Sequence, residues 1–284
     1  MTAAPAHWWR PWRQAGPLPG LGLTLGISLL WLSLIVLVPL LALLVKAAGL
    51  GPAGWWAIAS DIRVIAAMKL SFGTALVAAL VDTVIGGLIA WVLVRYRFPG
   101  RAVADALIDL PFALPTAVAG IALTAIYAGN GWLGHGLESA GWKVAYTPSG
   151  IVMALMFVGL PYTVRTVQPL LETLHREHEE ASASLGAGRF TTLWRVVLPQ
   201  VVPAMLTGFS LAFARGVGEY GSVIFIAGNL PYVSEIAPLL IVIKLEEFDY
   251  RSATVIATMM LATSFLILYL VNALQRRLSR GQAT

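Results

Sequence analysis

Six long apolar segments recur along the chain, with polar stretches between them. Each has close to the length of about 20 residues that an α-helix needs to cross the hydrocarbon core of a bilayer. Only 12% of the residues are charged, against about 25% in soluble domains, so the chain cannot cover a water-facing surface in the usual way. We therefore predict an all-α membrane protein with six transmembrane helices, at roughly Leu23–Val45, Leu70–Val94, Leu110–Tyr127, Ile151–Leu171, Val201–Ala227 and Ala253–Leu274.

The Lys and Arg residues are distributed unevenly between the two sides of this predicted bundle. If the N-terminus is inside, the inner segments hold twelve basic residues: those of both tails, of the loop after the second span and of residues 173–199, and Arg165. The outer segments hold six. The positive-inside rule then predicts that both termini are cytoplasmic. Residues 1–20 and 276–284 are the predicted tails. Residues 21–65 are predicted to form the first transmembrane helix and an outer loop. This helix is too long to be the core of a cleaved signal peptide.

Prolines interrupt two of the predicted spans. Pro111 and Pro115 interrupt the third, and Pro161 interrupts the fourth. Membrane helices tolerate proline where neighbouring helices or water satisfy the freed carbonyl groups, so we expect these helices to bend and pack inside the bundle. After the fifth span, the apolar run Leu239–Leu245 is too short to cross the bilayer and predicts a re-entrant or interfacial helix.

The segment before the fifth span is polar and favours helix. Residues 172–185 are rich in good helix formers, and Gly186 and Gly188 then break the pattern. A second short helix is predicted to end at Leu198-Pro199; it carries apolar residues at helical spacing, namely Phe190, Leu193, Trp194 and Val197. Such a segment could be a docking site for a partner protein on one face of the membrane. From periodicity alone, a helix lying on the bilayer surface is an equal alternative.

Two ionisable residues lie within the predicted fifth span. Arg215 and Glu219 are four residues apart and can meet on one helix face. A charge in a span costs about 3 kcal/mol unless it is paired or in a water-filled cavity. The pair could line an anion path, or it could be a neutral pair that fixes helix packing. Asp82 in the second span is another possible partner for Arg215, and three glycines nearby allow close approach of a helix or substrate: Gly216, Gly218 and Gly221.

Several function classes lose support from the sequence. The phosphate-binding pattern G-x-x-x-x-G-K-[ST] does not occur, so we do not expect the chain to hydrolyse nucleotide itself or to be an enzyme. No cofactor or metal site is predicted. A stand-alone secondary transporter would show internal repeats and mid-membrane carboxylates; Asp82 and Glu219 favour it, but no repeat is visible. A purely structural scaffold would leave the charges of the fifth span unexplained.

The polar segment carries a recognisable motif. Glu180-Ala181-Ser182, followed by Gly186 and closed by Leu198-Pro199, resembles the cytoplasmic "EAA" loop of bacterial ABC-importer permeases. The third position of that motif is usually alanine, and Ser182 is a small-for-small replacement. Further stretches narrow the resemblance. Residues 109–120 and 214–229 resemble sulfate and molybdate permeases, and residues 234–246 are similar to the T-type sulfate/thiosulfate permease subunit.

The resemblance implies a type I (MetI-like) ABC importer permease of the bacterial inner membrane, with its core at residues 66–275. The implied partners are a W-type second permease subunit, a dimer of ATPase subunits, a periplasmic sulfate/thiosulfate-binding protein and membrane lipid, but no nucleic acid. The loop from Glu180 to Pro199 would couple ATP hydrolysis to transport. Arg215, Glu219, Gly218 and Asp82 would contribute to an anion pathway or gate. A molybdate or tungstate importer remains the main alternative, and the segment Glu235–Ile241 favours sulfate.

Overall fold

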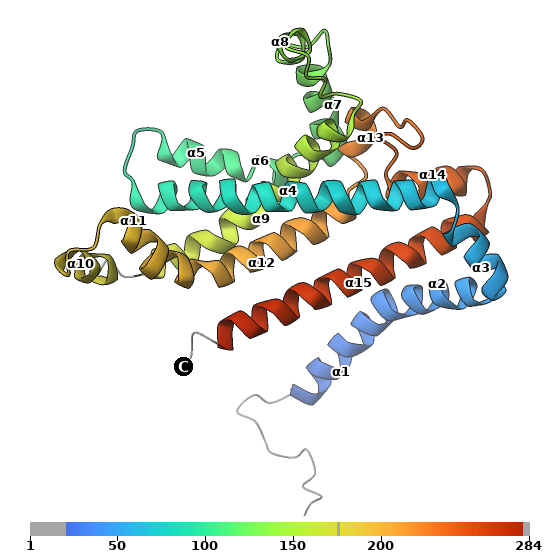
Figure 1. Cartoon of the computed structure of the whole chain (residues 1–284). Coiled ribbons are helices and arrows are strands. Elements are labelled where there is room, and N and C mark those ends of the chain that lie inside the picture. The colour runs from blue at the N-terminus through green and yellow to red at the C-terminus, as the bar shows by residue number, and fades with distance from the viewer. Residues whose placement is uncertain (1–20, 175–176, 281–284) are drawn as a thin grey trace, which may run out of the picture.

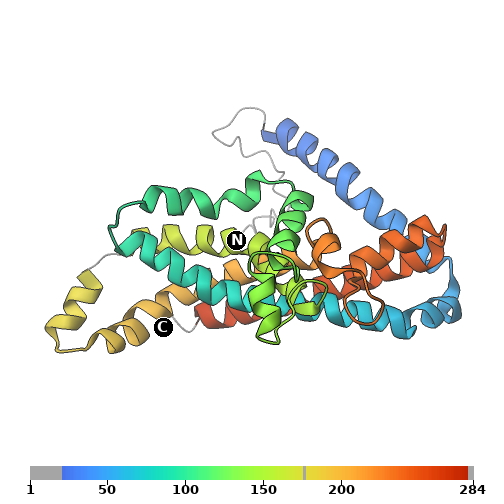
Figure 2. The same cartoon turned by 90° about the horizontal axis from the view of Figure 1, so that it is seen from above.

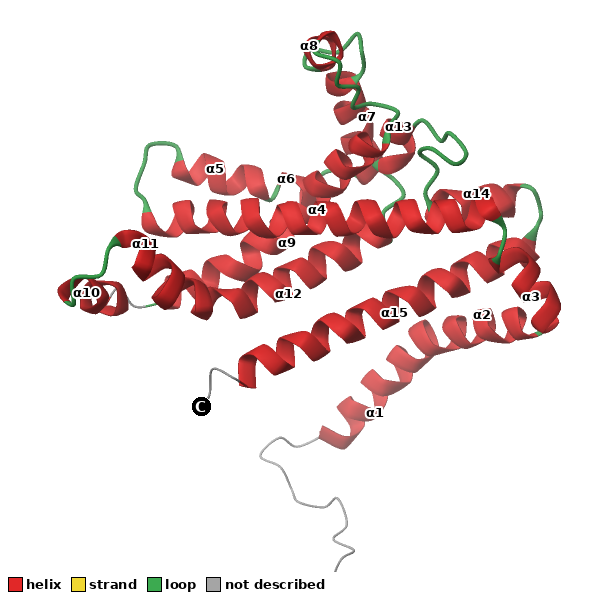
Figure 3. Cartoon of the chain, viewed as in Figure 1, coloured by secondary structure: helices red, strands yellow, loops and turns green. Residues whose placement is uncertain are grey.

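The structure is a computed structural model that describes residues 21–174 and 177–280, and all regular elements within these ranges are helices (Figure 3). The predicted N-terminal tail and the last four residues lie outside the described part. In chain order the elements are α1 (Leu21–Leu32), η1 (Ser33–Leu37), α2 (Val38–Ala48), α3 (Gly51–Ala59), α4 (Ile62–Arg95), α5 (Arg101–Ile108), α6 (Leu110–Ala113), α7 (Thr116–Tyr127), α8 (Gly134–Ser139), α9 (Pro148–Thr173), α10 (Glu177–Ser184), α11 (Arg189–Thr192), η2 (Leu193–Val197), α12 (Leu198–Val217), α13 (Val223–Ala227), α14 (Ala237–Glu246) and α15 (Tyr250–Arg280).

Five helices in the described ranges are long and apolar enough to cross a membrane, so the chain is a multi-pass membrane protein. They comprise Leu21–Ala48, Ile62–Arg95, Pro148–Thr173, Arg189–Val217 and Tyr250–Ala273. The third predicted span is different. Leu114 is extended ahead of Pro115, as the residue before a proline tends to be, and this divides the segment into α6 and the 12-residue α7.

The core is formed by α4, α9 and α12, which pack along one another (Figure 1). Small residues dominate the contact: Ala75, Ala78 and Ala79 of α4 are buried against Ala154 of α9 and Ala212 of α12. Small side chains let helix backbones approach closely where lipid removes the hydrophobic driving force. This three-helix core positions the candidate site described below.

Of the remaining long helices, α15 packs on one side of the core. Figures 1 and 2 show α15 beside α12, with α2 and α3 packed on α15 near its start. Every residue of α1 is exposed, and α1 packs mainly against its own continuation, η1. The two ends of the bundle differ. The short helices α10 and α11 lie at one end, and α3 and α14 lie at the other (Figure 1).

The prediction that a helix ends at Pro199 was wrong, because the helix continues from Arg189 to Val217. The predicted interruption at Pro161 was wrong as well, because α9 runs unbroken through it, but α9 does pack inside the bundle as expected. A proline ring clashes with the carbonyl four residues earlier in a regular helix. The wider π turn η2 ends two residues before Pro199 and relieves that clash, and η1 ends two residues before Pro39 in the same way. Pro161 is buried in the core, where neighbouring helices accommodate it.

Candidate functional site

The first part of the candidate site is the turn that follows α12. Helix α12 ends at Val217, so the predicted fifth span stops ten residues before Ala227, the predicted end. The chain turns through residues 218–222 and enters the short helix α13. Arg215 lies in the last turn of α12 and Glu219 lies just beyond it. The two side chains meet as predicted, with Arg215 Nη1 2.5 Å from Glu219 Oε2.

The two partners of this ion pair have different surroundings. Glu219 is only 2% exposed, and its Oε1 accepts hydrogen bonds from the Ser222 backbone N–H (2.9 Å) and hydroxyl (3.0 Å). The carboxylate is therefore fully engaged. The Arg215 side chain is 32% exposed, so it is open to the surface beside the turn. Gly218 is also exposed and has open space around it.

The turn interlocks with α7. A Cβ atom added at Gly120 would collide with the Ser222 backbone, and one added at Gly221 would collide with the Thr116 hydroxyl. Glycine at both positions therefore permits a close contact of α7 with the turn after α12. The motifs 109–120 and 214–229, far apart in the chain, pack directly on each other here. Sequence spacing drew attention to Gly221 but gave no reason to single out Gly120.

Asp82 does not pair with Arg215, so of the two possible partners the structure has Glu219. Asp82 is 1% exposed where α4 meets α9 and α12, and neither carboxylate oxygen has a hydrogen-bond partner among the described residues. Gly159 leaves the space that this carboxyl group fills, since an added Cβ would collide with Asp82 Oδ2. The Thr163 hydroxyl, one turn along α9, is also buried and without a described partner. The carboxyl group is therefore a polar element inside the helix core, away from the ion pair.

We expect Asp82→Asn to leave the amount of assembled subunit unchanged, with an equal or higher melting temperature. Burying an unpartnered carboxyl group is costly, because it must either carry a charge or take up a proton, and the amide keeps the shape without either cost. A gain of about 1 kcal/mol would raise the melting temperature by about 2–4 °C. The matched control is Asp109→Asn, which should lower it, because Asp109 accepts two hydrogen bonds from Arg165. If the Asp82→Asn subunit assembles in normal amounts but does not transport, the carboxylate itself is needed for transport.

The second part of the candidate site is the segment from α10 to the start of α12. As predicted, a helix, a glycine turn and a second helix follow one another. Gly186 has φ +80°, and the N–H groups of Gly186 and Ala187 donate to the carbonyls of Ala183 and Ser182. This is a Schellman cap with glycine in the left-handed position. The Ser182 hydroxyl lies 2.9 Å from the Thr192 hydroxyl and ties α10 to α11.

One ion pair connects this segment to the core helix α4. Arg95, at the end of α4, lies 2.7 Å from Glu179 Oε1 and also donates to the Leu174 carbonyl. Its guanidinium group stacks over the Trp91 ring at 5.5 Å. Glu179 directly precedes the Glu180-Ala181-Ser182 motif, so the motif is attached to a core helix next to its first residue. Sequence reasoning missed this contact; the only local signal is an arginine at a helix end.

The outer surface of this segment is open and partly apolar. Leu185 is 88% exposed and Phe190 72% exposed, with Trp194 beside the Phe190 ring. Glu180, Ala181 and Pro199 are exposed as well. Exposed apolar side chains next to charged ones are typical of a protein-docking surface.

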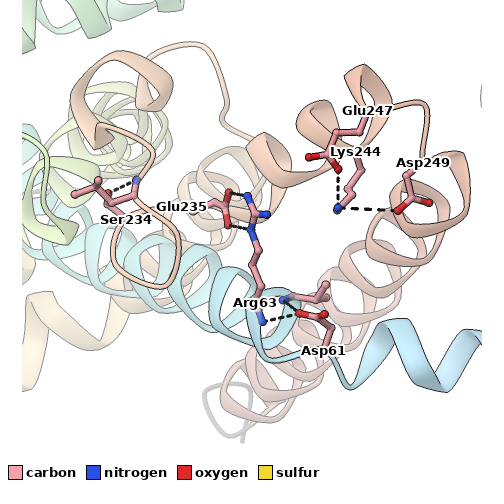
Figure 4. A network of polar contacts seen from close by, with 9 residues as sticks. Asp61, Arg63, Ser234, Glu235, Lys244, Glu247 and Asp249 are labelled. Atoms are coloured by element: carbon pink, nitrogen blue, oxygen red, sulfur yellow. Dashed lines mark hydrogen bonds and ion pairs between the residues drawn. The ribbon is translucent and has the colours of Figure 1, made fainter.

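A third polar network lies at the opposite end of the bundle (Figure 4). Glu235 is 2% exposed and accepts hydrogen bonds from Arg63 Nε (2.8 Å) and Nη2 (2.6 Å), which join the loop before α14 to the start of α4. Asp61 caps α4 by accepting from the Arg63 backbone N–H. Nearby, Lys244 holds Glu247 at 2.7 Å. Sequence reasoning missed this anchor because its partners are 172 residues apart.

Replacing Arg63 by alanine is expected to destabilise this end of the protein by about 1–3 kcal/mol, because the buried Glu235 carboxylate would lose both donors. The melting temperature of the detergent-solubilised protein measures the effect. Lys69→Ala, which removes an exposed cation from the same helix, should change it little. An Arg63→Ala protein as stable as the Lys69→Ala control would show that the network contributes nothing.

The chain matches the family model described as "binding-protein-dependent transport system inner membrane component" over residues 82–283. It is 48% identical over 263 residues to the sulfate transport system permease protein CysT of Escherichia coli, covering 93% of this chain and 95% of that relative. It is 47% identical over 250 residues to CysT of a Synechocystis species, covering 88% and 87%.

Solved structures of ABC importers share the fold. A bacterial transporter involved in alginate import matches with a TM-score of 0.75 at 15% identity, over 90% of this chain and 95% of that one. The MetNI methionine transporter matches with a TM-score of 0.52 at 17% identity, over 78% and 98%. Six transmembrane helices were predicted, but only five helices in the described ranges are long enough to cross a membrane, because α7 is too short. The chain belongs to the binding-protein-dependent transport system inner membrane components, and within that family to the CysT-type permeases.

Proposed function

We propose that this chain is the permease subunit of an ATP-driven importer that moves sulfate, and thiosulfate, across the bacterial inner membrane. The observation that carries the proposal is the 48% identity to a CysT protein over nearly the whole length of both chains. The five apolar helices and the importer fold agree with it. The sequence has no phosphate-binding loop, so ATP hydrolysis is assigned to a separate subunit.

The proposed assembly contains four kinds of subunit. A W-type permease pairs with this chain, a dimer of ATPase subunits binds the cytoplasmic face, and a periplasmic protein delivers sulfate or thiosulfate. A related alginate transporter has been solved together with its ligand-bound periplasmic protein, which supports the last assignment. We place both termini in the cytoplasm. The end with α10 and α11 then faces the ATPase, and the end with α3 and α14 faces the periplasm (Figure 1).

The proposed coupling route begins at the open surface of α10 and α11. There Glu180, Ala181, Ser182 and Gly186 would meet the ATPase, and Leu198-Pro199 would join this surface to α12 without a break in the helix. Because Glu179 is paired with Arg95, a displacement of α10 is passed to α4 as well. Motion at the ATPase therefore reaches two of the three core helices directly.

The proposed gate is the turn at residues 218–222 with Arg215. A divalent oxyanion crossing a low-dielectric region needs positive charge, but a strong trap would prevent its release. Arg215 is partly neutralised by Glu219 and partly exposed, so it offers weak attraction. The exposed Gly218 leaves space beside it. Asp82 is buried in the core without a described partner, and we propose that it acts there on helix packing rather than on the anion.

Labelled sulfate uptake in a strain lacking this gene tests the function. Restoring the chain should restore uptake, and removing the ATPase or the periplasmic binding protein should abolish it again. Molybdate uptake is measured in the same strains as the control for the main alternative substrate. Normal sulfate uptake in the deletion strain, with no second sulfate importer present, would overturn the proposal, and a molybdate defect alone would assign the chain to molybdate.

A further inference from the structure

A basic pocket of about 380 Å³ lies where the end of α2 meets the start of α15. This is the end of the bundle that also holds α3 and α14 (Figure 1). Two cations, two hydroxyl-bearing side chains and the turn after α2 line the pocket: Lys46, Arg251, Tyr250, Thr254, Gly49 and Leu50. Nothing in the proposed transport mechanism uses this pocket.

Neither cation is neutralised by an ion pair within residues 21–174 and 177–280. Both side chains are exposed. The carboxylate nearest to Arg251 along the chain, Asp249, is already engaged: it accepts a hydrogen bond from the Ser252 backbone N–H (3.1 Å) and lies 4.0 Å from Lys244 (Figure 4). The pKa of Asp249 is lowered by its bonds to Ser252 and by the charges of Lys244 and Arg251. The pocket therefore keeps two cationic donors for an outside anion.

The surroundings of the pocket are apolar. On α2, Leu41, Leu44 and Val45 are 58%, 44% and 70% exposed, and all of α1 is exposed. In the most apolar stretch of α15, only 11% of the residues are buried. In a membrane, exposed apolar side chains of spanning helices can contact acyl chains. Trp56 on α3 is 68% exposed, and exposed tryptophans of membrane proteins are enriched at the level of the lipid headgroups. The pocket thus lies at one end of two helices that carry exposed apolar side chains.

We propose that this pocket binds an oxyanion presented as the phosphodiester of an anionic phospholipid, with Lys46 and Arg251 as its charged ligands. Lys and Arg side chains close to a membrane surface attract anionic headgroups by about 1 kcal/mol each. Free sulfate has the same oxyanion chemistry, but it would gain nothing from the apolar faces of α1, α2 and α15. An amphiphile satisfies both halves of the site, with its headgroup in the pocket and its acyl chains along these helices. In the proposed topology this is the periplasmic leaflet.

The test uses the complete transporter complex in nanodiscs that contain phosphatidylglycerol or only phosphatidylcholine. Lipid retained after exchange into detergent is measured by native mass spectrometry. Each basic residue near an anionic headgroup contributes roughly fivefold in affinity. The variants Lys46→Gln and Arg251→Gln should therefore each weaken phosphatidylglycerol binding about fivefold, and the double variant about thirtyfold. Phosphatidylcholine binding should not change.

Lys69→Gln/Lys143→Gln is the matched control, because it removes two exposed cations outside the pocket. An equal loss of phosphatidylglycerol binding in this control would show that only the net charge of the protein matters, and it would overturn the proposed site. Undiminished phosphatidylglycerol binding in the double variant would overturn it as well. Labelled sulfate is added to the complex without the periplasmic protein as a separate arm. Sulfate binding that depends on Lys46 and Arg251, without any phosphatidylglycerol dependence, would reassign the pocket to the free anion.

Discussion

Arg215→Ala is expected to reduce sulfate uptake to background. Removing the arginine leaves Glu219, which is 2% exposed, as a buried carboxylate without its cation. Removing one partner of a buried pair costs about 3–5 kcal/mol. In the proposed gate the same change also removes the positive charge beside the turn. The variant therefore combines a local destabilisation with the loss of the proposed anion contact, and the two effects must be separated.

The double variant Arg215→Met/Glu219→Gln separates them. It keeps the side-chain volumes and removes both charges, so no uncompensated charge is buried. Assembly is followed by co-purification of the ATPase and by the melting temperature of the complex. We expect the double variant to assemble normally while sulfate uptake stays at background. If uptake returns together with assembly, the pair only fixes the packing of the turn and Arg215 does not serve the anion.

Gly186→Val is the second variant expected to abolish uptake, at normal amounts of subunit in the membrane. Gly186 has φ +80°, a conformation that β-branched residues avoid, and such strain costs about 1–3 kcal/mol. Relieving it would undo the Schellman cap that ends α10 and would shift α10 relative to α11. The surface proposed to meet the ATPase would then lose its shape. Sulfate uptake and ATPase co-purification are measured together.

Gly186→Asn is the matched control, because asparagine tolerates the left-handed conformation and can take this capping position. It should retain most of the uptake and the ATPase attachment. If Gly186→Asn is as defective as Gly186→Val, the partner requires the absence of a side chain at this point. If both variants transport normally, the turn has no part in coupling.

The transmembrane character and the polar segment could be predicted from the sequence because they are local properties. Apolar length marks a membrane helix, and glycine marks the turn at Gly186. The Arg215–Glu219 pair was predictable for the same reason, since a spacing of four residues brings side chains together near a helix end. Their contact needed no knowledge of the rest of the fold.

Helix ends were harder to predict. The residues from Val223 to Ala227 are as apolar as those of α12, so hydropathy joined two helices that a glycine-rich turn separates. At Pro199 the opposite error was made, because one continuous helix was predicted to be two. Proline indicated an end, but the π turn η2 carries the helix past it. A π turn has no simple sequence signature, so this outcome depends on the geometry of the backbone.

Contacts between distant segments could not be predicted. Glu235 and Arg63 are 172 residues apart, and Gly120 meets Ser222 only because α7 packs on the turn after α12. Asp82 shows the limit most clearly. Its charge favoured Arg215 as a partner, but the helix that faces it presents Gly159 instead. Which side chains face each other across the bundle depends on helix rotation, which a single sequence does not specify.

The most direct test of the account is labelled sulfate uptake into proteoliposomes that contain this subunit, the second permease and the ATPase, with the periplasmic binding protein added outside. Uptake should require ATP inside the vesicles, the ATPase and the binding protein together. Omitting any one of them should reduce uptake to background. Sulfate uptake by this chain without ATP and without the ATPase would contradict the account and would identify a transporter that works alone.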